Sequence, residues 1–293
     1  MLFYQIIGDQ YLSSIIDGIF FSIFAFIVGI ISSSLGVGGG FITTPSLILL
    51  GINESYAIGT VLFMIIFTAI SSTIAYARQP QKIEYRTGLL IAGPTVIGAV
   101  SGSLTSSYLA TEAPVIFRII FAICLFPIAI KMLFFPKEKK ETIEADDEIE
   151  HDEIFILGFE RREIYSAVLG LVVGFTSGLL GIGGGVVMVP ILVHVGKLSM
   201  HKSVATSVFI MIATSIAGAV VKISMGQIYP DLALFLVLGI ILGAQFGPRL
   251  NQRINTKRLQ QIFGFVMIIA LFSIAIGQDQ ILALIRGIIE IFF

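Results

Sequence analysis

A glycine-rich motif followed by proline occurs twice in the chain. Leu35 to Pro45 reads LGVGGGFITTP and Leu180 to Pro190 reads LGIGGGVVMVP, which places the two copies at a constant offset of 145 residues. The same offset aligns flanking residues, such as Val28 with Val173. The chain is therefore an internal duplication. In membrane chains, a helix-breaking element at matching places of two repeats indicates a transporter binding site.

These residues offer the chemistry of anion binding. Glycine permits positive φ and close approach of the backbone to a ligand. A half-helix that starts after the break leaves its first N–H groups without helical partners and carries about half a positive charge at that end. Pro45 and Pro190 are expected in its first turn. The predicted oxyanion-binding residues are Gly36, Gly38, Gly39, Gly40 and Phe41 in the first copy, and Gly181, Gly183, Gly184, Gly185 and Val186 in the second.

Neighbouring hydroxyl groups and one amide could refine this site. The additional candidates are Thr43, Thr44, Thr60, Ser177, Thr206, Ser207 and Gln245. Purely structural roles stay open for these residues and for the glycines, because hydroxyl side chains in membranes also bond their own helix carbonyls and glycines also let helices pack closely. Thr60 and Thr206 fit equally well as caps of the next helix in each half.

The composition is that of a polytopic membrane protein. Hydrophobic residues make up 56% of the chain, charged residues 13%, and the mean hydropathy is +0.98. With a net charge of −1, nothing suggests a nucleic-acid partner. The single cysteine, Cys124, excludes an internal disulfide, and we expect no metal or cofactor. The first residues lack the basic region and cleavage site of a secretory signal, so all 293 are treated as mature chain.

Hydrophobic runs long enough to cross about 30 Å of hydrocarbon predict four spans in each half. These spans are Ile15 to Leu35, Tyr56 to Ala77, Thr87 to Tyr108, Val115 to Phe135, Ile164 to Leu180, Ser203 to Ile223, Leu232 to Gly247 and Leu259 to Ile276. Phe41 to Leu50 and Val186 to Val195 are too short and are predicted half-helices. Ile281 to Phe293 is either a short span or an interfacial helix.

Basic residues in the loops indicate the orientation of the repeats. The loop ARQPQKIEYR carries Arg78, Lys82 and Arg86, whereas its partner SMGQIYPD carries no basic residue. One span later SLTSSYLATEAP has none and PRLNQRINTKRL has four. Equivalent loops thus face opposite sides, as in inverted-topology repeats. This places the N-terminus outside and the central linker in the cytoplasm, although a parallel duplication with irregular loop charges remains an alternative.

The expected fold is an all-α polytopic membrane protein with two inverted-topology repeats, each a broken-helix hairpin followed by three transmembrane helices. The predicted segments are repeat 1 (residues 1–136), an acidic cytoplasmic linker (137–163), repeat 2 (164–277) and a C-terminal short or interfacial helix (278–293). Eleven of the nineteen acidic residues lie between Glu138 and Glu163, so the linker is expected to be solvated.

Carboxylates are absent from the predicted membrane interior. Those outside the linker fall in or beside predicted loops: Asp9, Asp17, Glu54, Glu84, Glu112, Asp231, Asp279 and Glu290. This disfavours a cation substrate, because cation sites and proton relays in membranes usually need such a group. Arg118, Lys131 and Lys222 lie near span ends and are expected to snorkel to the interface, Arg118 also steering anions.

The segments SSSLGVGGGFITTPSLILLGINESYAIGT and GLLGIGGGVVMVPILVHVGKLSMHKSVATS resemble the two signature regions of the sulfite exporter TauE/SafE family of membrane permeases. The resemblance spans about Ile19 to Ile276 and implies a multi-pass carrier of sulfur-containing anions, such as sulfite or organosulfonates, in the cell membrane. The second half matches more closely than the first, where Phe41 to Thr44 depart from the pattern.

The sequence thus predicts a secondary transporter, and not an enzyme, that exports a small sulfur-containing anion by alternating access around a midplane site. A passive anion channel is the alternative, since it shares the dipole chemistry without coupled states. An enzyme is disfavoured because no metal-ligand spacing or nucleophile with a nearby base appears. The expected partners are the anion and the lipid bilayer. A coupling proton and the oligomeric state, a homodimer included, are left open.

Overall fold

The computed structural model describes residues 15–79, 83–113, 161–194 and 198–251, with isolated positions at 116–134, 196, 265 and 268. The described ranges fold into helices and contain no strand, which confirms the predicted all-helical class. Their helices are α2 (Ile15–Leu35), α3 (Gly40–Leu49), α4 (Glu54–Ala77), α5 (Tyr85–Glu112), α7 (Arg161–Leu180), α8 (Gly185–His194), α9 (Met200–Ser224) and α10 (Pro230–Asn251).

Helix lengths separate spans from half-helices. Among the described residues, α2, α4, α5, α9 and α10 are long and apolar enough to cross a membrane. Helices α3 and α8 have ten residues each, which is about 15 Å at 1.5 Å per residue and half of the hydrocarbon thickness. The two predicted half-helices are therefore confirmed. Most of the predicted spans Leu259 to Ile276 and Val115 to Phe135, the predicted linker up to residue 160 and the C-terminal segment lie outside the described residues.

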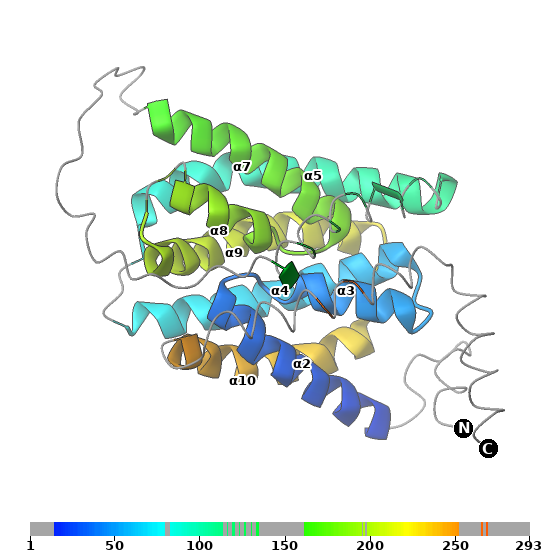
Figure 1. Cartoon of the computed structure of the whole chain (residues 1–293). Helices are drawn as coiled ribbons and strands as arrows, with labels where there is room; N and C mark the ends of the chain where they lie inside the picture. The colour runs from blue at the N-terminus through cyan, green and yellow to red at the C-terminus, as the bar shows by residue number, and fades with distance from the viewer. Residues whose placement is uncertain are drawn as a thin grey trace.

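The helices form three layers (Figure 1). Helices α4 and α9 pack against each other in the middle, α2 and α10 pack together on one side, and α5 packs on α7 on the other. Each outer pair therefore joins one helix from each half of the sequence. In Figure 1, α2 begins at the lower right and α7 at the upper left, and both run towards the centre of the molecule.

Glycines let the outer pairs approach backbone to backbone. A Cβ atom at Gly98 of α5 would collide with the carbonyl of Leu171 of α7, and one at Gly243 of α10 would collide with the carbonyl of Phe26 of α2. These two contacts are related by the same offset of 145 residues. Small residues at helix crossings are typical of membrane bundles, and here the duplication repeats the contact itself.

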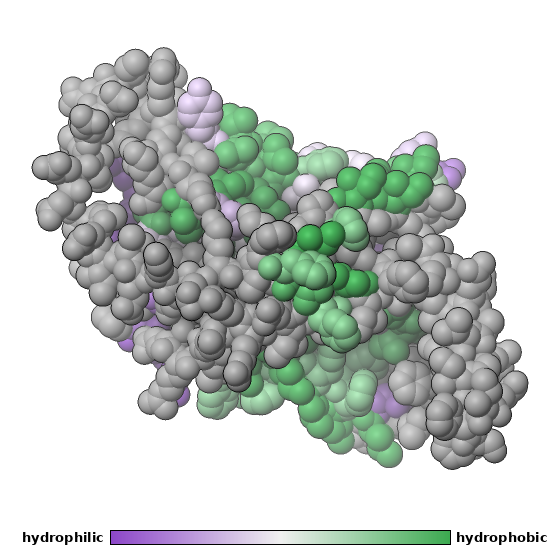
Figure 2. Space-filling model, viewed as in Figure 1, coloured by the Kyte–Doolittle hydropathy of each residue, from purple (hydrophilic) through white to green (hydrophobic). Residues whose placement is uncertain are grey.

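Outer helix faces carry exposed hydrophobic side chains. Ile16, Ile23 and Ile27 of α2 and Leu234 and Leu238 of α10 are each more than half exposed. Figure 2 shows hydrophobic surface along α2 at the bottom and over α5 and α7 at the top. A large apolar surface of this kind is stable in a bilayer rather than in water. The protein is a membrane-embedded, multi-pass protein.

Candidate functional site

Left-handed glycines end the helix that precedes each break. In the first half Gly36 has φ 72°, and the Val37 N–H donates to the Ser32 carbonyl oxygen at 2.9 Å. This is the pattern of a Schellman helix end, in which glycine adopts positive φ without a Cβ penalty. In the second half Gly181 has φ 66°, and its N–H donates to the Ser177 carbonyl oxygen at 2.8 Å.

A second left-handed glycine starts each half-helix. Gly39, with φ 83°, is the N-cap of α3 and provides no side-chain cap, while its carbonyl accepts from the Thr43 N–H at 3.1 Å. Gly184, with φ 76°, precedes α8, and its carbonyl accepts from the Met188 N–H at 2.9 Å. Because glycine has no side-chain acceptor, it cannot cap the first amide groups of either half-helix.

The two breaks lie against each other in the centre of the molecule. Gly40 is built against the carbonyl of Gly181, and Gly185 against the carbonyl of Gly36, so that a Cβ on either helix start would collide with the opposing break. All four residues are buried. The close backbone approach that these glycines allow is therefore, in this structure, an approach of one break to the other.

Hydroxyl groups link each break to the other repeat. Thr44 Oγ1 donates to the Gly181 carbonyl oxygen at 2.9 Å, and Ser207 Oγ donates to the Gly36 carbonyl oxygen at 2.9 Å. Both hydroxyl side chains are fully buried. Two of the predicted site residues thus satisfy break carbonyls across the repeat boundary.

Thr60 and Thr206 do not cap the helices in which they lie. Helices α4 and α9 begin six residues before them, so the interpretation as helix caps is wrong. Thr60 Oγ1 accepts from the Tyr229 N–H at 3.1 Å, and Thr206 Oγ1 accepts from the Glu84 N–H at 3.1 Å. Each threonine holds the loop before an outer helix of the other repeat, because α10 follows Tyr229 and α5 follows Glu84.

Two other polar candidates also have intramolecular partners. Thr43 Oγ1 donates to the Gly39 carbonyl oxygen of its own helix at 3.1 Å. Gln245 Nε2 donates to the Oγ and the carbonyl oxygen of Ser71 at 2.8 and 3.1 Å. The apolar candidates differ in burial, because Phe41 is fully buried and Val186 is half-buried.

Ser177 is the exception among the hydroxyl candidates. Its Oγ is buried and has no hydrogen-bond partner among the residues that the structure describes. The side chain lies beside Gly184, the residue that precedes the second half-helix. The repeat equivalent, Ser32, lies beside Gly39 and donates to the Gly29 carbonyl oxygen at a long 3.4 Å. Each half-helix start is therefore flanked by a serine hydroxyl.

The prolines lie deeper in the half-helices than expected. Pro45 and Pro190 are each the sixth residue of their helix, so their assignment to the first turn is wrong. The helices begin at Gly40 and Gly185, although glycine is a poor helix former. The contact of these glycines with the opposing break explains why no larger residue starts the helix.

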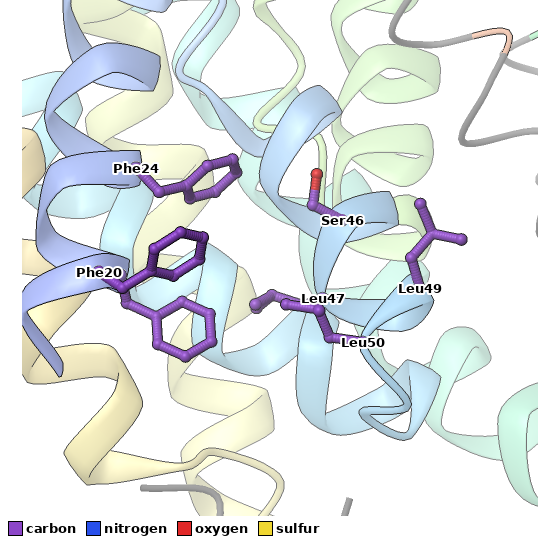
Figure 3. Close-up of a pocket in the computed structure, with 7 residues that line it drawn as sticks. Phe20, Phe24, Ser46, Leu47, Leu49 and Leu50 are labelled. Atoms are coloured by element: carbon purple, nitrogen blue, oxygen red, sulfur yellow. The ribbon is translucent and has the colours of Figure 1, made fainter. Parts of the chain in front are cut away.

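A groove of about 240 Å³ lies away from the breaks, between α2 and the C-terminal end of α3 (Figure 3). It is lined by Phe20, Phe21, Phe24, Ser46, Leu47, Leu49 and Leu50. The Ser46 hydroxyl donates to the Ile42 carbonyl oxygen of the same helix at 2.7 Å. These side chains offer no charge to an anion, so the groove is not the predicted binding site.

The environment of Lys222 differs from the interfacial position that the sequence predicts. Its side chain is fully buried, and Nζ donates to Ser55 Oγ at 2.9 Å, to Ser107 Oγ at 2.8 Å and to Gln227 Oε1 at 3.2 Å. The prediction that Lys222 snorkels to the interface is wrong. Arg118 and Lys131, for which the same was expected, lie outside the described residues. Within the described ranges no three His, Cys, Asp or Glu side chains come together as a metal site.

An all-helical, multi-pass bundle with broken helices at matching places of two repeats has the architecture of a membrane transporter. The sequence matches the model of the sulfite exporter TauE/SafE family over residues 21–274, and the chain belongs to this family. It is a membrane transporter and not an enzyme.

Similar proteins carry the same general description. The probable membrane transporter protein YunE of Bacillus subtilis is 32% identical over 256 residues, which covers 83% of this chain and 92% of that protein. The probable membrane transporter protein MJ0441 of Methanocaldococcus jannaschii is 29% identical over 261 residues, covering 84% and 90%. No solved structure matches the chain significantly.

Proposed function

We propose that the protein is a secondary transporter, an exporter by family, of a small sulfur-containing anion such as sulfite or an organosulfonate. The family description supplies the substrate class. The observation that carries the binding site is the buried Ser177 hydroxyl, which has no described partner and lies beside Gly184 at the start of α8.

The chemistry at this position suits an oxyanion. Each half-helix starts at a glycine-capped N-terminus, where amide N–H groups and about half a positive charge favour an anionic oxygen. The Ser177 hydroxyl adds a donor from α7 at the start of α8. Binding by such groups needs no ionised side chain at the breaks, which would be costly at membrane depth.

The contact between the breaks supports alternating access. Because Gly40 and Gly185 touch the opposing break, the substrate can pass only if the two repeats move relative to each other. The proposed inverted topology is supported by the exchanged outer pairs and by the equivalent bonds of Thr60 and Thr206 to the other repeat. Rocking of one repeat against the other is the usual motion of such carriers.

A flux assay with purified protein in liposomes tests this function. We expect saturable uptake of sulfite, sulfoacetate or a related anion from a panel that includes sulfate, taurine and thiosulfate. Counterflow, measured with and without an imposed pH gradient, separates a carrier from a passive channel. Transport of none of these anions together with transport of a cation would overturn the proposal.

A further inference from the structure

The hydrogen-bonded cluster around Lys222 joins three helices and one loop. Lys222 lies two residues before the end of α9, Ser55 in the first turn of α4, and Ser107 in the last turns of α5. Gln227 follows α9 in the chain. These helix ends meet towards the right-hand end of the bundle in Figure 1. The second glycine break is near, because Gly181 packs against Ile58 of α4 and the next residue, Gly59, packs against Lys222 and Gln227.

The ammonium group of Lys222 is buried without a carboxylate among the partners that the structure describes. Its three hydrogen bonds go to two hydroxyl oxygens and one amide oxygen, all neutral. Burying a charge is costly unless an opposite charge or a complete set of hydrogen bonds compensates for it. Lys222 lies in a helix that is long and apolar enough to span a membrane, and a buried ionisable side chain in such a helix is for this reason a candidate for function.

One oxygen atom is the focus of the cluster. Gln227 Oε1 accepts from Ser55 Oγ at 2.8 Å, from Ser107 Oγ at 2.7 Å and from Lys222 Nζ at 3.2 Å. An amide oxygen has two lone pairs, so three donors exceed its normal capacity. An ammonium and two hydroxyls that converge on one point match the higher charge of an anionic oxygen better than that of an amide.

The backbone explains how Gln227 reaches this position. Helix α9 ends in a Schellman motif, in which Gly226 has φ 66° and the Gln227 N–H donates to the Lys222 carbonyl oxygen at 2.9 Å. This motif brings the residue after the glycine next to the residue five positions earlier. The Gln227 carbonyl also packs against Gly59 of α4, where a Cβ would collide with it. Gly226 is exposed and Gln227 is half-buried, so the cluster borders the surface.

We propose that Lys222, Ser55 and Ser107 form a second binding site for a small oxyanion, in which the Gln227 amide oxygen occupies the position of an anionic oxygen. The anion enters as the Gln227 side chain withdraws, and it then compensates the buried charge of Lys222. This proposal rests on the proposed function in one respect, which is the chemical identity of the anion.

The described residue of the first repeat that corresponds to Lys222 is not a cation. The residue related to Lys222 by the offset that aligns Thr60 with Thr206 is Tyr76. Tyr76 is also fully buried, and its hydroxyl donates to the Ser33 carbonyl oxygen at 2.8 Å. A neutral phenol therefore stands where the other repeat has a cation. The second site is specific to the end of the bundle at which α9 finishes.

The variant Gln227→Glu tests the site without any ligand. It places a tethered carboxylate oxygen where the amide oxygen now accepts three bonds, so it should raise the thermal midpoint of the purified full-length protein. The control Ser224→Glu adds the same charge at an exposed position in the last turn of α9 and should not raise it, because a carboxylate there is unfavourable with the helix dipole. An unchanged or lowered midpoint for Gln227→Glu would overturn the proposal.

Anion binding provides the second readout. Stabilisation by methanesulfonate should need at least about tenfold more anion in Gln227→Glu and in Lys222→Met than in the wild type, and Ser224→Glu should respond as the wild type does. A Gln227→Glu titration that superimposes on the wild type would also overturn the site, even if Lys222→Met does not fold. If Gln227→Glu is stabilised and the wild-type protein transports a cation but none of the tested anions in liposomes, this site stands and the proposed transport function is overturned.

Discussion

At the scale of single residues, four hydroxyl side chains near the breaks bond to the other repeat, whereas no such bond is described for Ser177. Thr44 and Ser207 donate to break carbonyls of the other repeat, and Thr60 and Thr206 accept from its backbone. These four side chains hold the two halves together. Ser177 has no such described partner, and its hydroxyl can therefore donate to a ligand without breaking a bond of the fold.

We expect Ser177→Ala to weaken substrate binding and leave stability nearly unchanged. Losing one hydrogen bond to an anion should raise KM about tenfold. Stability should change little, because the structure describes no hydrogen bond of Ser177 Oγ that the substitution would remove. The control Ser207→Ala removes the bond to the Gly36 carbonyl oxygen and should lower the unfolding free energy by about 1–2 kcal/mol. Initial uptake rates and thermal unfolding measure both effects. An unchanged KM for Ser177→Ala would remove the hydroxyl from the site.

The motif could be predicted from the sequence, whereas the Lys222 cluster could not. The breaks are local, and glycine spacing shows them directly. Ser55, Ser107 and Lys222 come from three helices far apart in the chain, and only the fold brings them together. One local signal was available: Gly226 after the helix places Gln227 over Lys222. Burial of the lysine, which decides against snorkelling, has no signature in composition.

At the scale of the helices, apolar length predicted the spans well and helix starts less well. The expected span Ile15 to Leu35 coincides with α2, and α4 begins two residues before the expected Tyr56. The half-helices instead begin one residue early, at Gly40 and Gly185. Propensity disfavours glycine there, and the contact with the opposing carbonyl outweighs it. Tertiary contacts of this kind cannot be read from a single segment.

Glycines of α5 should respond differently to alanine according to what they touch. Gly98→Ala places a methyl group against the backbone of α7, which cannot move aside, and should cost about 1–3 kcal/mol of stability. Gly88→Ala meets the ring edge of Phe209. That side chain can turn, and the gain in helix propensity offsets the shift, so the change should stay within about 1 kcal/mol.

Thermal unfolding in one detergent compares the two variants under the same conditions. The ratio of the two losses in stability is more informative than either loss alone, because both substitutions add the same methyl group to the same helix. Equal losses for Gly88→Ala and Gly98→Ala would show that backbone contact between α5 and α7 does not set the spacing of this outer pair.

At the scale of the whole molecule, the duplication arranges the helices in equivalent pairs, but the two ends of the bundle differ. Helices α4 and α9 form the centre, and each outer pair takes one helix from each half. The glycine breaks follow this symmetry, since their contacts occur in equivalent pairs. Lys222 and Tyr76 break it. A carrier with a cationic site at one end would receive an anion differently from the two sides of the membrane.

The proposed orientation can be tested by labelling the two ends of α9. This helix has 25 residues, or about 37 Å at 1.5 Å per residue, enough to separate the two faces of a bilayer. Met225 and Ser199 flank it and are exposed. The only cysteine, Cys124, can be replaced by serine. Single cysteines at positions 225 and 199 then report each end independently.

Because basic loops face the cytoplasm, a membrane-impermeant maleimide should label Met225→Cys on intact cells and Ser199→Cys only after permeabilisation. Both should react fully in detergent, which controls for local accessibility. Labelling of both from outside would contradict a membrane-spanning α9. Labelling of Ser199→Cys on intact cells, and of Met225→Cys only after permeabilisation, would show the opposite orientation in the membrane. The Lys222 site would then lie on the cytoplasmic face, where it would receive the anion before export.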